Sequence, residues 1–304
     1  MATPITTGSF AKALWPGVNA WYGREYDAYP VEFDILFEKH TSKRNYEQDV
    51  GVSGFGLLAV KNEGAPTSYD TEQQGFTTTY RHTVYSSGFI ITQEMMDDDQ
   101  YDVVAPRRAK QLAFAARQTK EVNGANVYNR AFNTGYLGGD GSALLVSTHA
   151  NVAGGTWSNI LSTASDLSEA ALEQACIDIS LLKDDRGLTI ALVGESLHIP
   201  PQLEFEAARI LKTQYRVGTD NNDINALKEL GKFRKGASVN HFFTDADAWF
   251  IRTNAKDGMK YFERKADTFT MDNDFDTENA KFKVQGRYSF GWSDPRGLYG
   301  TPGA

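Results

Sequence analysis

A run of acidic residues near the C-terminal end has side chains that a calcium site would use. Residues 272–276 read Asp-Asn-Asp-Phe-Asp and place carboxylates at alternate positions, as in the first half of a calcium-binding loop. The pattern fails where the geometry is most demanding. Thr277 stands where the sharp turn needs glycine, and Lys283 stands where the bidentate glutamate belongs. We therefore interpret this run as a solvated acidic turn and predict no metal site.

Two other segments contain residue types that bind phosphate or act as nucleophiles. Residues 138–142 are rich in glycine but lack the lysine and hydroxyl ending of a phosphate-binding loop. Ser147 and His149 lie two residues apart, but no glycine elbow surrounds the serine. The single cysteine, Cys176, forbids an internal disulfide, and we expect it to be a small buried apolar residue. We predict no catalytic residue and no cofactor, hence a protein that is not an enzyme.

The charge balance excludes further classes of function. The chain has 304 residues, with 31 Lys and Arg against 39 Asp and Glu, which gives a net charge of -8. Proteins that bind nucleic acid with their main surface need clustered cations, so this balance argues against that role. No stretch approaches the roughly 20 apolar residues that span a bilayer, and residues 1–10 do not form a secretory signal. We expect a soluble protein of the cytoplasm with no membrane partner.

The N-terminal third predicts extended segments with little core of their own. The first 45 residues form an irregular arm in which aromatic residues are scattered among Gly and Pro, and these aromatics pack either on the same chain or on a neighbouring subunit. Residues 46–75 form a long polar excursion with one apolar run, 57–60. Residues 76–92 are β-like, with a break at 86–88. Excursion and strand together predict a two-stranded loop that returns to the body.

The remaining segments predict a helical and β-rich body. Residues 104–132 have the composition of one long helix with Pro106 near its start. A helix capped by Ser168, a buried strand at 188–193 and a helix opened by Pro200 and Pro201 follow as an α/β unit. Residues 280–292 alternate between apolar and polar side chains, which predicts a long half-buried strand. We expect the long helix to pack against it.

Several ordered segments resemble the major head (capsid) proteins of tailed bacteriophages, in particular the Mu-like major head subunits. They cover essentially the whole chain and comprise 45–47, 88–92, an acidic run with Tyr101, 117–121, 125–132, 138–141, Thr148 with His149, 154–159 and 167–172. The resemblance implies an α+β, HK97-like capsid fold. It assigns an N-terminal arm (1–45), an E-loop (46–88), a P-domain (89–144) with a spine helix at about 104–132, an A-domain (145–250) and return strands of the P-domain (251–304).

The same resemblance implies a function in the virion. It predicts a major capsid protein that is assembled in the bacterial host cytoplasm as hexamers and pentamers of an icosahedral shell, which encloses DNA without sequence-specific binding. A portal and a decoration protein are further implied partners. Many relatives begin with a cleaved scaffolding segment, whereas here the arm starts almost at Met1, so a separate scaffolding protein is expected. Some relatives crosslink a lysine with an asparagine, but nothing in this sequence identifies such a pair.

The expected inter-subunit contacts come from the arm and the E-loop. Our hypothesis is that both lie over neighbouring subunits and bury apolar side chains there, with the candidates Trp15, Trp21, Tyr22, Leu57, Leu58 and Val60. Two other classes remain compatible with the sequence. A tail or adhesin-like phage component would also be acidic, aromatic and β-rich. A metal-dependent hydrolase would need the turn at 272–276 to bind its metal.

Overall fold

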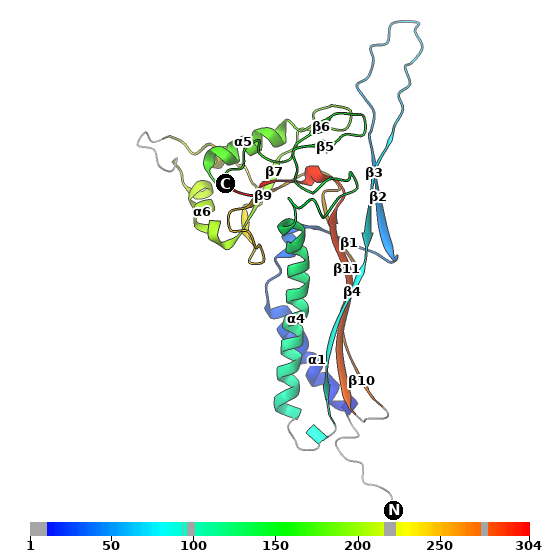
Figure 1. Cartoon of the computed structure of the whole chain (residues 1–304), viewed down its shortest axis with the longest axis vertical. Coiled ribbons are helices and arrows are strands. Elements are labelled where there is room, and N and C mark those ends of the chain that lie inside the picture. The colour runs from blue at the N-terminus through cyan, green and yellow to red at the C-terminus, as the bar shows by residue number, and fades with distance from the viewer. Residues whose placement is uncertain (1–10, 93, 96–100, 216–222, 275–278) are drawn as a thin grey trace, which may run out of the picture.

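Two four-stranded sheets organise the part of the chain that the structure describes, which is residues 11–92, 94–95, 101–215, 223–274 and 279–304 of a computed structural model (Figure 1). The side chains of residues 11–18, 101–104 and 273 lie outside this description. The helices are α1 (Ala11–Ala28), α2 (Phe33–Leu36), α4 (Tyr101–Asn129), α5 (Glu169–Ser180), α6 (Glu204–Lys212) and α7 (Ala226–Glu229), with 3-10 turns η2 (Pro201–Leu203) and η3 (Pro295–Gly297). The strands are β1 (Glu38–Thr41), β2 (Tyr46–Val52), β3 (Gln74–Arg81), β4 (Thr83–Ile91), β5 (His149–Ala150), β6 (Thr156–Trp157), β7 (Gly194–Ile199), β8 (Ala237–Val239), β9 (Trp249–Thr253), β10 (Met259–Asn273), β11 (Ala280–Trp292) and β12 (Leu298–Thr301).

The first sheet, which we call the long sheet, has the strand order β1-β10-β11-β4 and carries α4 on one face. Strand β11 confirms the predicted alternation, since Phe282 and Val284 are buried while Lys281 and Lys283 are exposed. The buried side chains of α4 that meet this face include a small-residue stripe at one-turn spacing, Ala105, Ala109 and Ala113. Small side chains let the helix approach the strands closely. The predicted packing of a long helix on long strands is confirmed.

Helix α1 replaces the irregular arm that we expected before residue 29. Its aromatic residues Tyr22 and Tyr26 lie four positions apart and therefore share one helical face. Tyr22 is buried, and its ring stacks on Phe269 of β10 with centroids 4.4 Å apart. The Tyr26 hydroxyl donates a hydrogen bond to Asp267 over 2.6 Å. The prediction of an irregular segment was wrong here because Gly17 and Gly23 obscured this helical spacing.

The second sheet, which we call the short sheet, has the order β12-β9-β7-β8 and packs against α5, α6 and α7. Ser168 caps α5 as predicted, since its side chain accepts a hydrogen bond from the Ala171 amide. The helix after Pro200 is also confirmed, as η2 and α6. The strand predicted at 188–193 was wrong, because Ala191 has a φ of 55° that interrupts an extended chain and β7 begins only at Gly194.

Two of the expected segment boundaries also need correction. The E-loop was expected to run to residue 88, but β4 pairs with β11 from Thr83 onward and belongs to the long sheet. The expected break at 86–88 is absent because Gly88 marks a close approach of strands: a Cβ there would overlap the carbonyl oxygen of Phe282. Residues 251–304 do not all return to the long sheet, since β12 pairs with β9 after the η3 turn.

Besides the buried side chains under each sheet, a further cluster of buried side chains joins the two sheets at the C-terminal end of α4. Tyr128 is fully buried there and packs edge-on against Phe250 of the short sheet, with centroids 5.3 Å apart. Its hydroxyl donates a hydrogen bond to the Leu36 carbonyl over 2.9 Å. Tyr128 therefore connects α4, the helix that carries it, to α2 and to the short sheet.

We predict that Tyr128→Phe lowers the free energy of unfolding by about 1–3 kcal/mol, because the buried Leu36 carbonyl loses its hydrogen-bond donor while the ring packing is kept. Urea unfolding of the unassembled full-length subunit measures the change. Tyr69→Phe is the matched control, since Tyr69 is 92% exposed and should be neutral. Equal stability of the Tyr128 variant and the wild type would contradict this account.

Candidate assembly surfaces

The feature that stands furthest from any core is a hairpin made of β2, β3 and the connection between them. We call this connection, residues 53–73, the tip. It projects beyond the body at one end of the molecule (Figure 1). Three predicted contact residues lie in the tip and are almost fully exposed: Leu57 at 84%, Leu58 at 97% and Val60 at 94%. Apolar side chains gathered on a projecting segment are typical of an interaction site, because nothing in the same chain removes them from water.

The tip nevertheless has an organised backbone. The carboxylate of Asp70 accepts hydrogen bonds from the amides of Gly56 and Thr71, each over 2.8 Å, and thereby joins the two sides of the tip. These hydrogen bonds, that from Gly56 first, hold the pKa of Asp70 below its ordinary value. Arg186 lies 3.5 Å from Asp70 and donates to the Thr71 carbonyl. The loop before Leu188 therefore supports the tip from the side.

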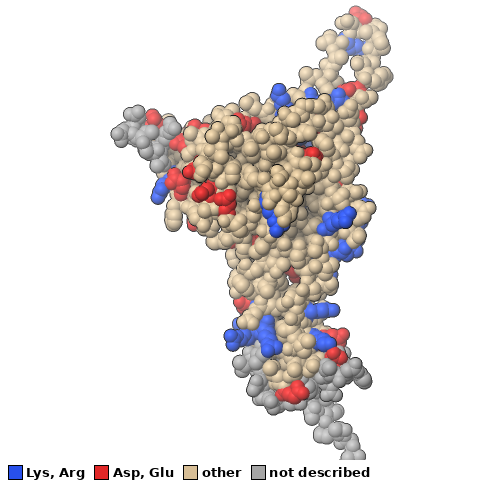
Figure 2. All heavy atoms as spheres, in the orientation of Figure 1, with Lys and Arg blue, Asp and Glu red and all other residues tan. Residues whose placement is uncertain are grey.

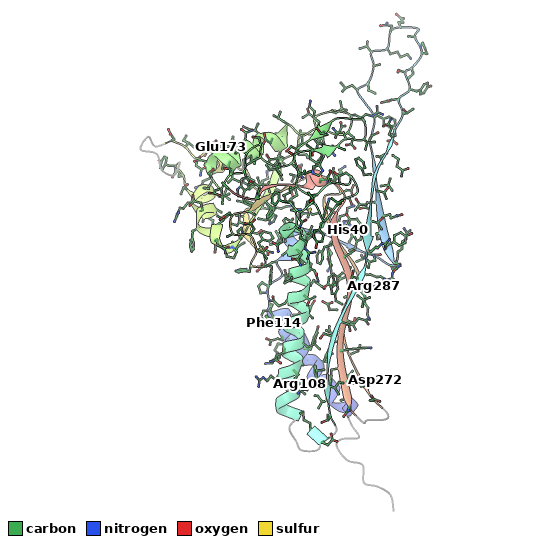
Figure 3. The ribbon with its side chains drawn as sticks, viewed as in Figure 1. His40, Arg108, Phe114, Glu173, Asp272 and Arg287 are labelled. Atoms are coloured by element: carbon green, nitrogen blue, oxygen red, sulfur yellow. The ribbon has the colours of Figure 1, made fainter. Side chains whose placement is uncertain are left out.

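The two ends of the hairpin are held by one side chain of the long sheet. Arg287 of β11 donates to Asn45, just before β2, over 2.5 Å and to the carbonyl of His82, just after β3, over 3.1 Å. Figure 3 shows Arg287 beside the strands below the hairpin. The His82 ring bonds Ser289 and Ser42 through its two nitrogens, and burial lowers the pKa of His82.

A second anchor connects β2 to β10. The Lys260 ammonium is almost completely buried and lies 2.6 Å from carboxylate oxygens of both Asp49 and Asp257. Ser293 donates to the same Asp49 carboxylate over 2.6 Å. Burial by itself would raise the pKa of Asp49, but the hydrogen bonds from Lys260 and Ser293 lower it below its ordinary value. The hairpin is thus positioned by polar contacts at its base in place of an apolar core.

We predict that Lys260→Met loosens the hairpin, because Asp49 keeps a partly buried charge without its cation, a loss of about 2 kcal/mol or more. The backbone amides of β2 and β3 should exchange with solvent deuterium at least about tenfold faster, as one power of ten corresponds to 1.4 kcal/mol. Lys256→Met, an exposed lysine four positions away, should leave exchange unchanged. Unchanged exchange in the Lys260 variant would show that this anchor is dispensable.

The segment that enters the long sheet from α1 is fixed by a buried carboxylate on α4. Glu121 accepts hydrogen bonds from the amides of Glu32 and Phe33, the latter over 2.9 Å, at the start of α2. Burial raises the pKa of Glu121 to about 7, although these two hydrogen bonds act in the opposite direction. The neighbouring Lys120 pairs with Asp267 over 2.9 Å. Residues 19–36 are therefore attached to this chain's own body.

The raised pKa of Glu121 makes stability depend on pH. The folded chain binds this proton more tightly than the unfolded chain, whose value is near 4.5, so the contribution is lost as pH rises toward about 7. We predict that Glu121→Gln removes this dependence. Between about pH 5 and about pH 8, the stability of the wild type relative to the variant should fall by roughly 2 kcal/mol in urea unfolding. Glu72→Gln, exposed on the tip, should show no such change, and a constant difference for Glu121→Gln would refute the assignment.

The residues considered for chemistry have structural contacts. His149 is buried and bonds Asp140 over 2.6 Å and Asn159 over 3.2 Å, whereas Ser147 is exposed and takes no part in these contacts. Cys176 is buried as expected, and burial raises its pKa. Of the acidic turn, residues 275–278 lie outside the described residues, and Asp274 pairs with Lys281.

Within the described ranges, no group of three His, Cys, Asp or Glu side chains is arranged to hold a metal. No helix in them combines the length and apolar character needed to cross a membrane.

The candidate contact residues fall into three groups. Leu57, Leu58 and Val60 are exposed on the tip, as given above. Tyr22 is buried within the chain and Trp21 packs beside it, so the first of the two open alternatives, packing on the same chain, applies to these side chains. Trp15 lies in α1, but its side chain is outside the described residues.

Sequence reasoning missed a second exposed apolar surface, on the helices beside the short sheet. Ile177 of α5 and Leu181, the residue that caps its C-terminal end, are 52% and 65% exposed and lie four positions apart, and Phe205 of α6 is 73% exposed. The hairpin and these helices occupy opposite ends of the upper body (Figure 1). On the face drawn in Figure 2, Asp and Glu gather over the α6 end, whereas Lys and Arg follow the sides of the long sheet and α4. Apolar residues off the buried stripe of α5 were the available signal.

Comparisons with known proteins agree with this architecture. A family model with the description phage capsid protein matches residues 75–300. No curated protein matches the chain significantly in sequence.

Three solved structures show the same fold at low identity. The capsid of the cyanophage P-SCSP1u has a TM-score of 0.60 at 11% identity and covers 90% of this chain and 88% of its own. A structure of Mycobacterium phage Che8 gives 0.53 at 14% identity, covering 90% and 93%. The virus-like particle from Pyrococcus furiosus gives 0.52 at 12% identity, covering 94% and 98%. The predicted α+β, HK97-like fold is confirmed.

Proposed function

The chain belongs to the phage capsid protein family and is a structural protein of the virion shell, and from this premise we propose how it assembles. Copies of the chain form hexamers and pentamers that close into an icosahedral head. The hairpin of each subunit lies over a neighbour and buries its apolar tip there. The observation that carries this proposal is the tip itself, an organised loop whose apolar side chains meet no core of their own chain.

The energetics of such a contact suit a shell. Burying an exposed leucine or valine side chain is favourable by about 1.5–3 kcal/mol, so Leu57, Leu58 and Val60 together supply at least about 4.5 kcal/mol. Association costs of similar size leave each single contact weak. Many weak contacts in a closed shell add through their high effective concentration. A shell held in this way is stable as a whole while its subunits can still correct their positions during growth.

Further parts of the proposal concern partners and place. Assembly in the host cytoplasm involves a scaffolding protein, a portal and a decoration protein, as the resemblance implies. The net charge of -8 supports enclosure of DNA without tight or sequence-specific binding, because phosphate affinity requires clustered cations. The subunit performs no catalysis in this scheme, since the Asp140, His149 and Asn159 side chains serve to hold loops together.

We predict that replacing Leu57, Leu58 and Val60 together with serine yields a folded subunit that forms no closed shells, because the tip can no longer bury apolar surface on a neighbour. Electron microscopy of the overexpressed full-length chain tests this directly. The same three positions changed to methionine are the matched control, which keeps apolar surface and should still assemble. Normal shells from the serine variant would overturn the proposed role of the hairpin.

A further inference from the structure

A pocket of about 470 Å³ lies between the C-terminal part of α4 and the strands β3, β4 and β11. Arg81 and Arg130 both line it, together with Asn123 and Asn126, and no Asp or Glu is among its lining residues. Neither arginine has a carboxylate partner among the described residues. A concave site with two unpaired guanidinium groups is suited to an anion, and it is notable in a chain with more acidic than basic residues.

The walls of the pocket add aromatic surface to this charge. The Arg130 guanidinium stacks on the Tyr136 ring at 4.4 Å, which holds its planar group in place. Phe290 and Trp292 also line the pocket and add apolar ring surface to it. The pocket therefore offers two cations and apolar ring surface together. A small inorganic anion would bind the arginines and leave the aromatic side chains of the pocket uncovered.

The hairpin tip has the complementary chemistry. Residues 53–73 contain three carboxylates, Glu63, Asp70 and Glu72, against one lysine, Lys61, and Asp70 is used inside the tip. Glu63 lies at the outer turn, where the Ala65 amide bonds the Asn62 carbonyl, close in sequence to the exposed residues 57–60. A chain cannot fill its own pocket in this way, because its hairpin points away from α4 and β11 (Figure 1). A hairpin tip that fills this pocket must therefore come from a second copy.

We propose that this pocket receives the hairpin tip of a second copy, with Glu63 meeting Arg130 and Arg81 while apolar side chains of the tip cover the aromatic wall. This inference rests on the proposed function and adds the receiving site on the neighbour. Phosphate groups of nucleic acid would also suit two arginines, but they would leave both apolar surfaces, that of the pocket and that of the tip, in water.

Charge reversal across the contact tests the proposal. Arg130→Glu and Glu63→Arg should each lower the yield of closed shells at least tenfold, and the double variant should recover most of the yield because the pair is restored with opposite sign. Arg107→Glu, an exposed arginine of α4 outside the pocket, is the matched control and should assemble normally. Normal shells from Arg130→Glu, or no recovery in the double variant, would overturn the proposal.

A crosslinking experiment guards against variants that merely misfold. In a Cys176→Ala background, chains with Glu63→Cys are mixed with chains with Arg130→Cys and treated with a short bis-maleimide. A crosslinked dimer is expected, and shells without crosslinks would contradict the contact. If the serine variant of the tip fails to assemble while Arg130→Glu assembles, the proposed function stands and this pocket does not receive the tip. Shells of Arg130→Glu that form normally but retain less DNA would assign the pocket to nucleic acid instead.

Discussion

The pairing of β11 with β10 on one side and β4 on the other is the contact on which the rest of the molecule depends. The thirteen residues of β11 place Phe282 and Val284 against the alanine stripe of α4, and this packing fixes the helix. The same strand carries Arg287, which holds both ends of the hairpin. The alternating sequence of β11 therefore puts apolar side chains on the face that packs against α4 and polar side chains, including Arg287, on the opposite face.

This arrangement explains why the hairpin projects. Its two ends meet at Arg287, so residues 46–81 must leave the body and return to the same place. The base is held by Lys260, Asp49 and the His82 contacts, all of which are polar and directional. The tip has no such constraint from a core, and it can present apolar side chains to another subunit. A hairpin that is held rigidly at its base loses less conformational freedom when its exposed tip binds another subunit.

Much of this could be predicted from the sequence where the pattern is local. The alternation at 280–292, the capped helix at Ser168 and the long central helix are each determined by neighbouring residues, and the structure has them nearly as predicted. Non-local pairing was harder. Nothing local shows that Gly88 marks a close approach of strands, or that β12 leaves the long sheet to join β9. Nothing local shows either that residues of α4, β3 and β11 come together to form a pocket lined by two arginines.

Hydrogen–deuterium exchange of the full-length chain, compared between unassembled subunits and closed shells, tests most directly whether the hairpin makes the contact that builds the shell. The amides of residues 57–60 should exchange quickly in the subunit, where their side chains are exposed, and at least about tenfold more slowly in shells. The amides of 135–137 at the edge of the pocket should gain protection as well. Closed shells in which residues 53–73 exchange as fast as in free subunits would contradict the account.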